Sequence, residues 1–300
     1  MTESVLLHEL VASAAQRSPD APALGVDGRS VAYGELGAAV ERVAAGLVEL
    51  GLRRGQRLAV WLDKRVEFVV ACFATSAAGG VFVPVNPLLK PEQVAHILAD
   101  CNVRILVTTA QRCALLQAVL PSCPDLREIV LVSDPAEQAS AAQRTTAWDA
   151  LTNTPARPGP RVLDGDMAAI LYTSGSTGRP KGVVLSHRNM VTGAKSVASY
   201  LGNHAGDTLL AVLPLSFDAG FSQLTTAFHA GARVVLLNYL LPKDVLKAME
   251  RERVTGLTAV PPLYIQLVQH PWPSAIDEHL RYFANTGGRM PRQTLMQRRQ

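Results

Sequence analysis

The strongest constraint on the fold is a regular alternation of short apolar runs with stretches of helical spacing. Apolar runs typical of strands occupy residues 57–62, 81–85, 104–108 and 128–132, and apolar residues recur at helical spacing over 36–50, 66–78, 92–100 and 111–120. Strands that are apolar along their whole length and separated by helices favour a mostly parallel sheet covered on both faces. The first part of the chain is therefore predicted to be a doubly wound α/β lobe.

A second alternating series follows a stretch without periodicity. Residues 133–165 are rich in Ala, Ser, Thr, Asp and Pro and end near the Pro-Gly-Pro of 158–160, which indicates a linker. Further strands are predicted at 167–173, 208–213, 233–237, 256–260 and 280–286. The sequence thus predicts two doubly wound α/β lobes, the first with its linker over 1–160 and the second over 161–300.

Composition narrows the functional classes. The formal charge of +4 comes with only 18% charged residues, so nucleic-acid binding is not indicated. The uncharged stretch 68–89 is broken by Gly and Pro, which argues against a membrane span. The first residues, MTESVLLHEL, lack a secretory signal pattern, and the four cysteines lack the spacing of zinc ligands, so we expect a cytoplasmic protein without a cysteine metal site.

A loop rich in glycine and hydroxyl groups follows the apolar run 167–173. Glycines let backbone N–H groups approach phosphate oxygens, hydroxyls add donors, and an ammonium neutralises charge. The spacing differs from the Walker form, because a proline precedes the lysine and no Ser or Thr follows it directly. The residues predicted to bind phosphate are Thr173, Ser174, Gly175, Ser176, Thr177, Gly178 and Lys181.

The segment 172–189, YTSGSTGRPKGVVLSHRN, resembles the signature loop of the adenylate-forming superfamily, which includes acyl-CoA ligases, peptide-synthetase adenylation domains and luciferases. Weaker matches in the family's order lie at 33–36, 83–87, 214–218 and 286–291. The resemblance therefore covers nearly the whole chain. It implies the fold of the large N-terminal domain of these enzymes.

The resemblance also implies a reaction and its ligands. The loop would grip the β- and γ-phosphates of ATP, with Lys181 as the catalytic charge partner and Mg²⁺ sharing that role. A small carboxylic acid would be activated as an acyl-adenylate and passed to the thiol of CoA or of phosphopantetheine on an acyl carrier protein. Gly287 and Gly288 match the family's glycine turn beside the adenine and the acyl group, although a plain turn at a strand end has the same pattern.

Phe217-Asp218 distinguishes two branches of the family. Many acyl-CoA ligases carry a histidine-containing segment here, whereas amino-acid-activating domains show Phe-Asp, whose carboxylate pairs with the substrate's ammonium group. The alternative interpretation is that Asp218 caps a helix starting near Gly220. His187, which follows the loop, is interpreted as a packing or capping residue.

Other motifs of the family do not occur in these 300 residues: a Tyr-Gly-x-Thr-Glu segment, a ribose-binding Asp, a hinge and a C-terminal domain with a catalytic Lys. We therefore expect a truncated chain that has little or no adenylation activity alone. The first hypothesis for the whole protein is an AMP-forming acyl-CoA ligase, and the second is an amino-acid or acyl-carrier-protein ligase. A non-enzymatic alternative is a remnant that binds nucleotide or a partner chain.

Overall fold

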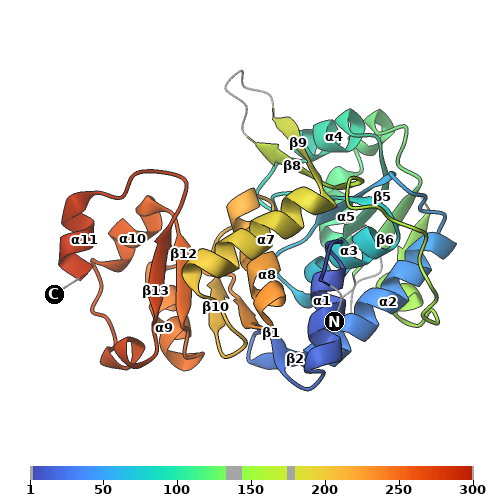
Figure 1. The fold of residues 1–300 in the computed structure, drawn as a ribbon. Coiled ribbons are helices and arrows are strands. Elements are labelled where there is room, and N and C mark those ends of the chain that lie inside the picture. The colour runs from blue at the N-terminus through green and yellow to red at the C-terminus, as the bar shows by residue number, and fades with distance from the viewer. Residues whose placement is uncertain (1–2, 133–143, 174–179, 299–300) are drawn as a thin grey trace.

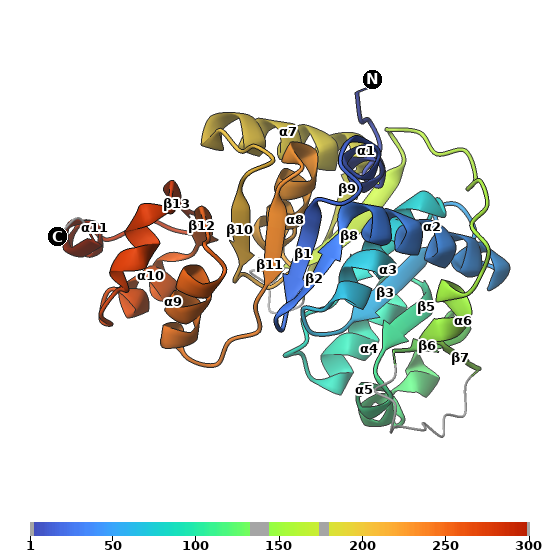
Figure 2. The same cartoon turned by 90° about the horizontal axis from the view of Figure 1, so that it is seen from below.

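The computed structural model describes residues 3–132, 144–173 and 180–298. Within these ranges the strands form two sheets with helices packed against them (Figures 1 and 2). Each sheet is parallel apart from one antiparallel pair at an edge. The structure therefore confirms the predicted α/β fold with two lobes, each built on a largely parallel sheet.

The seven-stranded sheet pairs its strands in the order β7-β6-β5-β3-β4-β8-β9. Its central strands β4 and β6 are buried along their whole length, as expected for strands that helices cover on both faces. The β8–β9 hairpin projects from one edge (Figure 1). The strands are β3 (Arg57–Trp61), β4 (Val81–Pro84), β5 (Val103–Thr108), β6 (Glu128–Leu131), β7 (Thr145–Ala147), β8 (Met167–Thr173) and β9 (Lys181–Ser186).

The six-stranded sheet has the order β13-β12-β10-β11-β1-β2. Its antiparallel pair, β1 and β2, forms a hairpin whose turn contains Asp27 and Gly28, both at positive φ. Figures 1 and 2 show β12 and β13 at the end of this sheet that lies away from the seven-stranded sheet. The strands are β1 (Pro22–Val26), β2 (Arg29–Ala32), β10 (Thr208–Ala211), β11 (Arg233–Leu236), β12 (Gly256–Ala259) and β13 (Tyr282–Asn285).

The helices connect successive strands, as the alternating pattern predicts. The α-helices are α1 (Glu9–Arg17), α2 (Tyr33–Glu49), α3 (Val66–Ala77), α4 (Pro91–Asp100), α5 (Ala110–Leu116), α6 (Trp148–Thr152), α7 (His187–Leu201), α8 (Asp218–Ala230), α9 (Pro242–Arg251), α10 (Pro261–Leu267) and α11 (Arg292–Arg298). Two short 3₁₀ helices are η1 (Leu120–Ser122) and η2 (Ser274–Glu278). Helices α3 and α8 contribute to one apolar core that contains residues of both sheets.

Aromatic side chains join the two lobes through this core. Phe82 of β4 stacks on Phe221 of α8 with ring centroids 4.8 Å apart, and Phe73 of α3 meets Phe228 of α8 edge to face at 5.3 Å. All four rings are almost completely buried. Because large aromatic side chains bury much area each, these contacts hold the two sheets together as one packed body.

The two sheets exchange strands across the division expected at residue 160. Strand β1, from the first predicted lobe, pairs with β11, and β8, from the second, pairs with β4. The sheets therefore do not follow the division of the chain into 1–160 and 161–300. Local periodicity indicates that a strand forms but not which strand it pairs with. The hydrophobic pattern therefore could not predict that β1 and β8 would pair across the division at residue 160.

The uncharged segment 68–89 forms most of α3 and all of β4. Both elements lie in the protein core, where Phe68 and Val83 are almost fully buried. In the described ranges, no helix has the length and apolar character needed to cross a membrane.

His187 connects the start of α7 to the N-terminal segment. Ser186 caps this helix by accepting a hydrogen bond from the Asn189 N–H, and the His187 side chain is fully buried. Its Nδ1 accepts the N–H of Leu7 at 3.1 Å, so the proton of the neutral ring lies on Nε2. Burial, followed by the nearby His8, lowers the pKa of His187 to about 4. His187 is therefore a packing residue, as expected.

We expect acid to destabilise the fold partly through His187. Its pKa of about 4 lies below the ordinary 6.5, so the unfolded chain binds more protons between these values. The stabilising contribution is complete above pH 6.5 and is lost as the pH falls towards 4, by about 2 kcal/mol at a pH of roughly 4.5. Urea unfolding at neutral and acidic pH should show a smaller acid loss for His187→Asn than for wild type. Equal losses would contradict this role.

Candidate functional site

The predicted site residues gather at one edge of the structure, where parallel strands end. Thr173 ends β8, Asp218 follows the end of β10, and Gly287 follows the end of β13. Crevices outside the carboxyl ends of parallel strands are the usual ligand sites of open α/β sheets. The fold thus brings together residues that are far apart in the sequence.

The two ends of the predicted phosphate loop are fixed by the β8–β9 hairpin. Thr173 pairs with Lys181 across the two strands, and both side chains are exposed. The Lys181 ammonium makes no hydrogen bond or ion pair within the described residues. The predicted loop residues Ser174, Gly175, Ser176, Thr177 and Gly178 lie outside the described residues. An unpaired cation beside such a loop is suited to an anionic ligand.

Tyr172 anchors the strand that leads into this loop. Its hydroxyl donates to Oδ2 of Asp100 at 2.5 Å, and its ring is almost fully buried. Burial, strengthened by the Asp100 carboxylate, raises the pKa of Tyr172 well above its ordinary value, so the phenol stays protonated. The contact fixes the exit of β8 against α4. Sequence reasoning gave no role to Asp100, because it lies 72 residues from Tyr172.

A cavity of about 220 Å³ adjoins the ends of the loop. It lies between the segments that follow β4, β8 and β10. Polar side chains that line it belong to Asn86, Gln93, Thr173 and Ser216. The buried Ser216 hydroxyl has no hydrogen-bond partner among the described residues. Such a group is costly when left unpaired, so this cavity can offer a donor to a bound ligand.

Lys64 fixes the segment between β10 and α8 from the other lobe. Its Nζ donates to the carbonyl of Val212 at 2.9 Å and to that of Leu237 at 2.8 Å. Burial lowers the pKa of Lys64 to about 8. These bonds connect the ends of β10 and β11 to the end of β3. Sequence reasoning missed this residue, since a single lysine after a strand carries no distinguishing pattern.

A second cavity, of about 230 Å³, lies along the six-stranded sheet beside α7 and α8. It extends from the carboxyl ends of the strands, at Asn285 and Thr286, to their amino ends, at Gly256 and Tyr282. Asp218 lines it as the first residue of α8. The two cavities thus lie on either side of the turn that contains Ser216, Phe217 and Asp218.

Asp218 is not the N-cap of α8. The cap position belongs to Phe217, and no side chain makes a capping hydrogen bond there. The Asp218 carboxylate is exposed and has no hydrogen bond or ion pair within the described residues. A carboxylate in the first turn is favoured by the helix dipole, but that interaction leaves its oxygens free. Asp218 can therefore accept hydrogen bonds from a cationic ligand.

Gly287 and Gly288 form the turn after β13. Gly287 has a φ of 74°, which favours glycine, and an added Cβ would lie 3.2 Å from Val260. The Gly288 carbonyl accepts a hydrogen bond from Asn285 Nδ2 at 2.6 Å. The turn is thus held close to the second cavity, which Asn285 and Thr286 line. Its role towards a nucleotide or an acyl group stays a prediction.

Comparisons with known proteins agree with this arrangement. The model of the AMP-binding enzyme family matches residues 11–300. The chain is 33% identical over 283 residues to 4-coumarate–CoA ligase 2 of Oryza sativa subsp. japonica. This alignment covers 89% of the chain and 49% of that protein. It is 35% identical over 238 residues to L-proline–[L-prolyl-carrier protein] ligase of Streptomyces coelicolor, covering 76% and 44%. The chain spans about half the length of the curated relatives it matches.

Solved structures share the fold. ATP-bound MatB from Rhodopseudomonas palustris superposes with a TM-score of 0.85 at 27% identity, covering 98% of this chain and 57% of that one. The anthranilate CoA ligase AuaEII in complex with anthranoyl-AMP has a TM-score of 0.88 at 22% identity, covering 97% and 57%. The motifs, the fold and the family match together show that the chain belongs to the AMP-binding enzyme family of adenylate-forming ligases.

Proposed function

We propose that the whole protein uses ATP to convert a carboxylic acid into an acyl-adenylate with release of pyrophosphate, and then transfers the acyl group to a thiol. The proposal rests on Lys181, which has no partner among the described residues and begins β9 beside the predicted loop, and on Asp218, which lines a cavity. An anion-binding loop next to a pocket for a small molecule is what the reaction needs. The relatives named above include CoA ligases and a carrier-protein ligase.

The chemistry explains the residue types. The substrate carboxylate attacks the α-phosphate of ATP, which is already negatively charged, so catalysis rests on positioning and on stabilising charge. Thr173 and Lys181, with the loop between them, would hold the β- and γ-phosphates and then the departing pyrophosphate. Mg²⁺, which binds phosphate oxygens readily, would share that charge when present. The thiol acceptor would be CoA or phosphopantetheine.

The residues that are described fit a nucleotide at this edge. Lys181 has no competing acidic partner among them, and the Ser216 hydroxyl in the adjoining cavity is unpaired. Calorimetric measurement of the binding of ATP with Mg²⁺ to this chain tests whether these residues fit a nucleotide. Saturable binding that weakens in Lys181→Ala supports the fit, and a folded chain that does not bind would show that these residues alone do not form the nucleotide site.

An amine-bearing acid is a second candidate substrate class, favoured by the free carboxylate of Asp218. Asp218 lines the pocket and has no partner among the described residues, so its oxygens can accept hydrogen bonds from a cation, and an α-ammonium group would supply one. The structure also removes the capping role that was the alternative interpretation. The acyl-CoA ligase hypothesis and the amino-acid hypothesis therefore differ in one testable residue.

If the substrate is an amino acid, we expect Asp218→Ala to lower kcat/KM for amino-acid-dependent pyrophosphate exchange by about 10- to 100-fold. The estimate follows from roughly 1.5–3 kcal/mol for a hydrogen bond to a charged group. The whole protein would be assayed with matched acids that carry or lack the α-amine. Asp218→Asn serves as the isosteric control and should show a similar loss. Amino-acid exchange that survives both substitutions would show that Asp218 does not pair with the ammonium group.

A further inference from the structure

The inner end of the cavity beside α8 is closed by Tyr282. Gly256 of β12 and Tyr282 of β13 are register partners, and both line the cavity. A Cβ added to Gly256 would lie 2.4 Å from Cζ and from the hydroxyl oxygen of Tyr282. The ring therefore crosses directly over Gly256, which is possible only because that residue has no side chain. Tyr282 forms a wall across the strands at this end.

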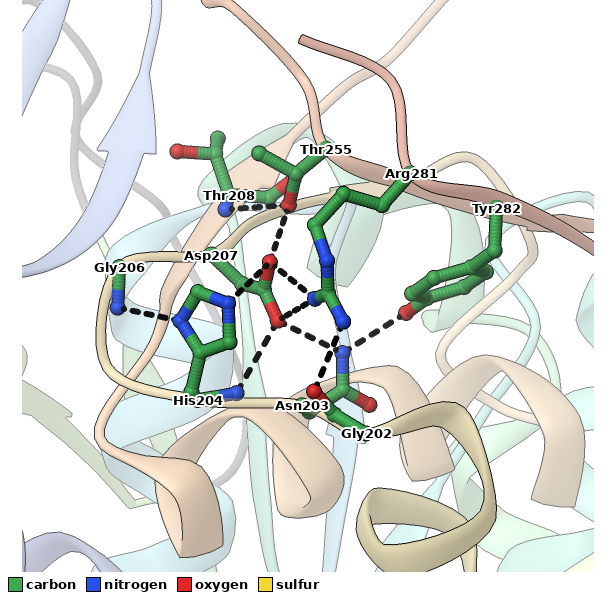
Figure 3. A network of polar contacts seen from close by, with 9 residues as sticks. All are labelled: Gly202, Asn203, His204, Gly206, Asp207, Thr208, Thr255, Arg281 and Tyr282. Atoms are coloured by element: carbon green, nitrogen blue, oxygen red, sulfur yellow. Dashed lines mark hydrogen bonds and ion pairs between the residues drawn. The ribbon is translucent and has the colours of Figure 1, made fainter.

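A polar network holds the Tyr282 ring in this position (Figure 3). Asn203 Nδ2 donates to the Tyr282 hydroxyl oxygen at 3.0 Å and to Oδ2 of Asp207 at 3.1 Å. The fully buried Asp207 also accepts hydrogen bonds from Arg281, from the Thr255 hydroxyl and from the His204 N–H. The Asp207 carboxylate can only accept a hydrogen bond, so it orients the Asn203 amide with Nδ2 towards Asp207 and Tyr282. The wall is thus attached to the amino ends of three strands.

The cavity in front of this wall is small, and polar and apolar groups contribute about equally to its lining. Its volume of about 230 Å³ is below the ~300–1,000 Å³ of pockets for drug-sized ligands. Gln223 is held by bonds from Nε2 to the carbonyls of Leu210 and Thr258, and its buried Oε1 has no partner among the residues described. The other polar side chains along the cavity include Ser222, Thr226, Thr258, Asn285 and Thr286.

We propose that Tyr282 is a specificity-determining residue that limits the length of the acid, and that this pocket selects compact acids with polar groups along the chain over long-chain fatty acids. The proposal rests on the proposed function, since it takes this cavity as the acid pocket. A long alkyl chain would have to displace the ring from Gly256 and would leave the hydroxyl and amide groups of the lining without partners. A compact hydroxylated or amidated acid satisfies those groups.

The test compares acid-dependent pyrophosphate exchange by the whole protein over two series of increasing length, straight-chain fatty acids and their hydroxylated counterparts. Wild type should prefer short hydroxylated acids and show a sharp length limit. Tyr282→Ala should raise kcat/KM by about 10-fold or more for acids just beyond that limit, because one methylene in a pocket changes kcat/KM by about 10- to 200-fold. Tyr282→Phe retains the ring and should retain the limit. Gly256→Ala should push the ring into the cavity and shorten the limit.

The outcomes separate this inference from the proposed function. A folded Tyr282→Ala protein with the wild-type length limit, or a wild type that prefers long-chain fatty acids, would overturn the inference while leaving adenylation intact. If the wild-type protein shows no pyrophosphate exchange with any acid of the two series, and none with amino acids, the proposed function is overturned and this inference with it. If Tyr282→Ala does not fold, the Gly256→Ala and Tyr282→Phe pair decides: a shorter limit for Gly256→Ala beside a wild-type limit for Tyr282→Phe supports the wall, and equal limits for the two variants exclude it.

Discussion

Replacing Lys181 by alanine is expected to lower the rate of acid-dependent pyrophosphate exchange by the whole protein by about 100-fold or more. The ammonium group has no partner among the described residues, and it stands where β9 leaves the predicted phosphate loop. Removal of one group that stabilises transition-state charge costs roughly 10²–10³ in kcat. The exposed position of Lys181 means that the fold itself should tolerate the change.

The control for this experiment is Lys247→Ala. Lys247 is also exposed, lies on α9 and loses the same charge, so it reports any effect of net charge on exchange. We expect Lys247→Ala to leave the exchange rate near that of wild type, and Lys181→Arg to restore part of the lost rate because the charge returns. Similar rates for Lys181→Ala and Lys247→Ala would show that the loop does not use Lys181 to bind phosphate.

The largest expected effect on stability comes from Asp207. Its carboxylate is fully buried and accepts two bonds from Arg281 Nη1, each 2.6 Å long, beside the bonds from Thr255 and Asn203 (Figure 3). Burial alone would raise the pKa of Asp207, but these hydrogen bonds outweigh it and the pKa is lowered. Asp207→Ala leaves Arg281 without its carboxylate, and breaking such a pair costs about 3–5 kcal/mol. The midpoint of urea unfolding should fall accordingly.

A matched ion pair on the surface separates the effect of burial on stability from the effect of losing a charge. Arg188 and Asp164 also form an ion pair, at 2.8 Å, but their side chains are 68% and 39% exposed. Asp164→Ala should therefore cost less than about 1 kcal/mol. If Asp207→Ala and Asp164→Ala destabilise the fold equally, the Asp207 network does not hold the amino ends of β10, β12 and β13 together.

The fold class could be predicted, and candidate site residues could be proposed, because their signals are local. Continuous apolar runs indicate buried parallel strands wherever they occur, and the loop between Thr173 and Lys181 has a composition that only an anion site requires. Asp218 could be singled out from its position in a motif. Each of these predictions depends on neighbouring residues in the sequence.

The pairings between distant segments could not be predicted in the same way. The contact of Tyr172 with Asp100 and that of Lys64 with Leu237 depend on how strands pair, which is not encoded in local periodicity. The exchange of β1 and β8 between the sheets has the same origin. Asn203 and Tyr282 meet across 79 residues, so the position of Tyr282 at the end of the cavity could be found only from the structure.

The most direct test of the central claim is the fate of ATP in the reaction of the whole protein with ATP, Mg²⁺, a thiol acceptor and a panel of carboxylic acids. ATP labelled at the α-phosphate should yield AMP and pyrophosphate, with an acyl-adenylate detectable when the thiol is left out. The yield should depend on the acid and fall with Lys181→Ala. Formation of ADP and phosphate instead, or AMP formation that is independent of any acid, would contradict the assignment of this protein as an acid-activating, adenylate-forming ligase.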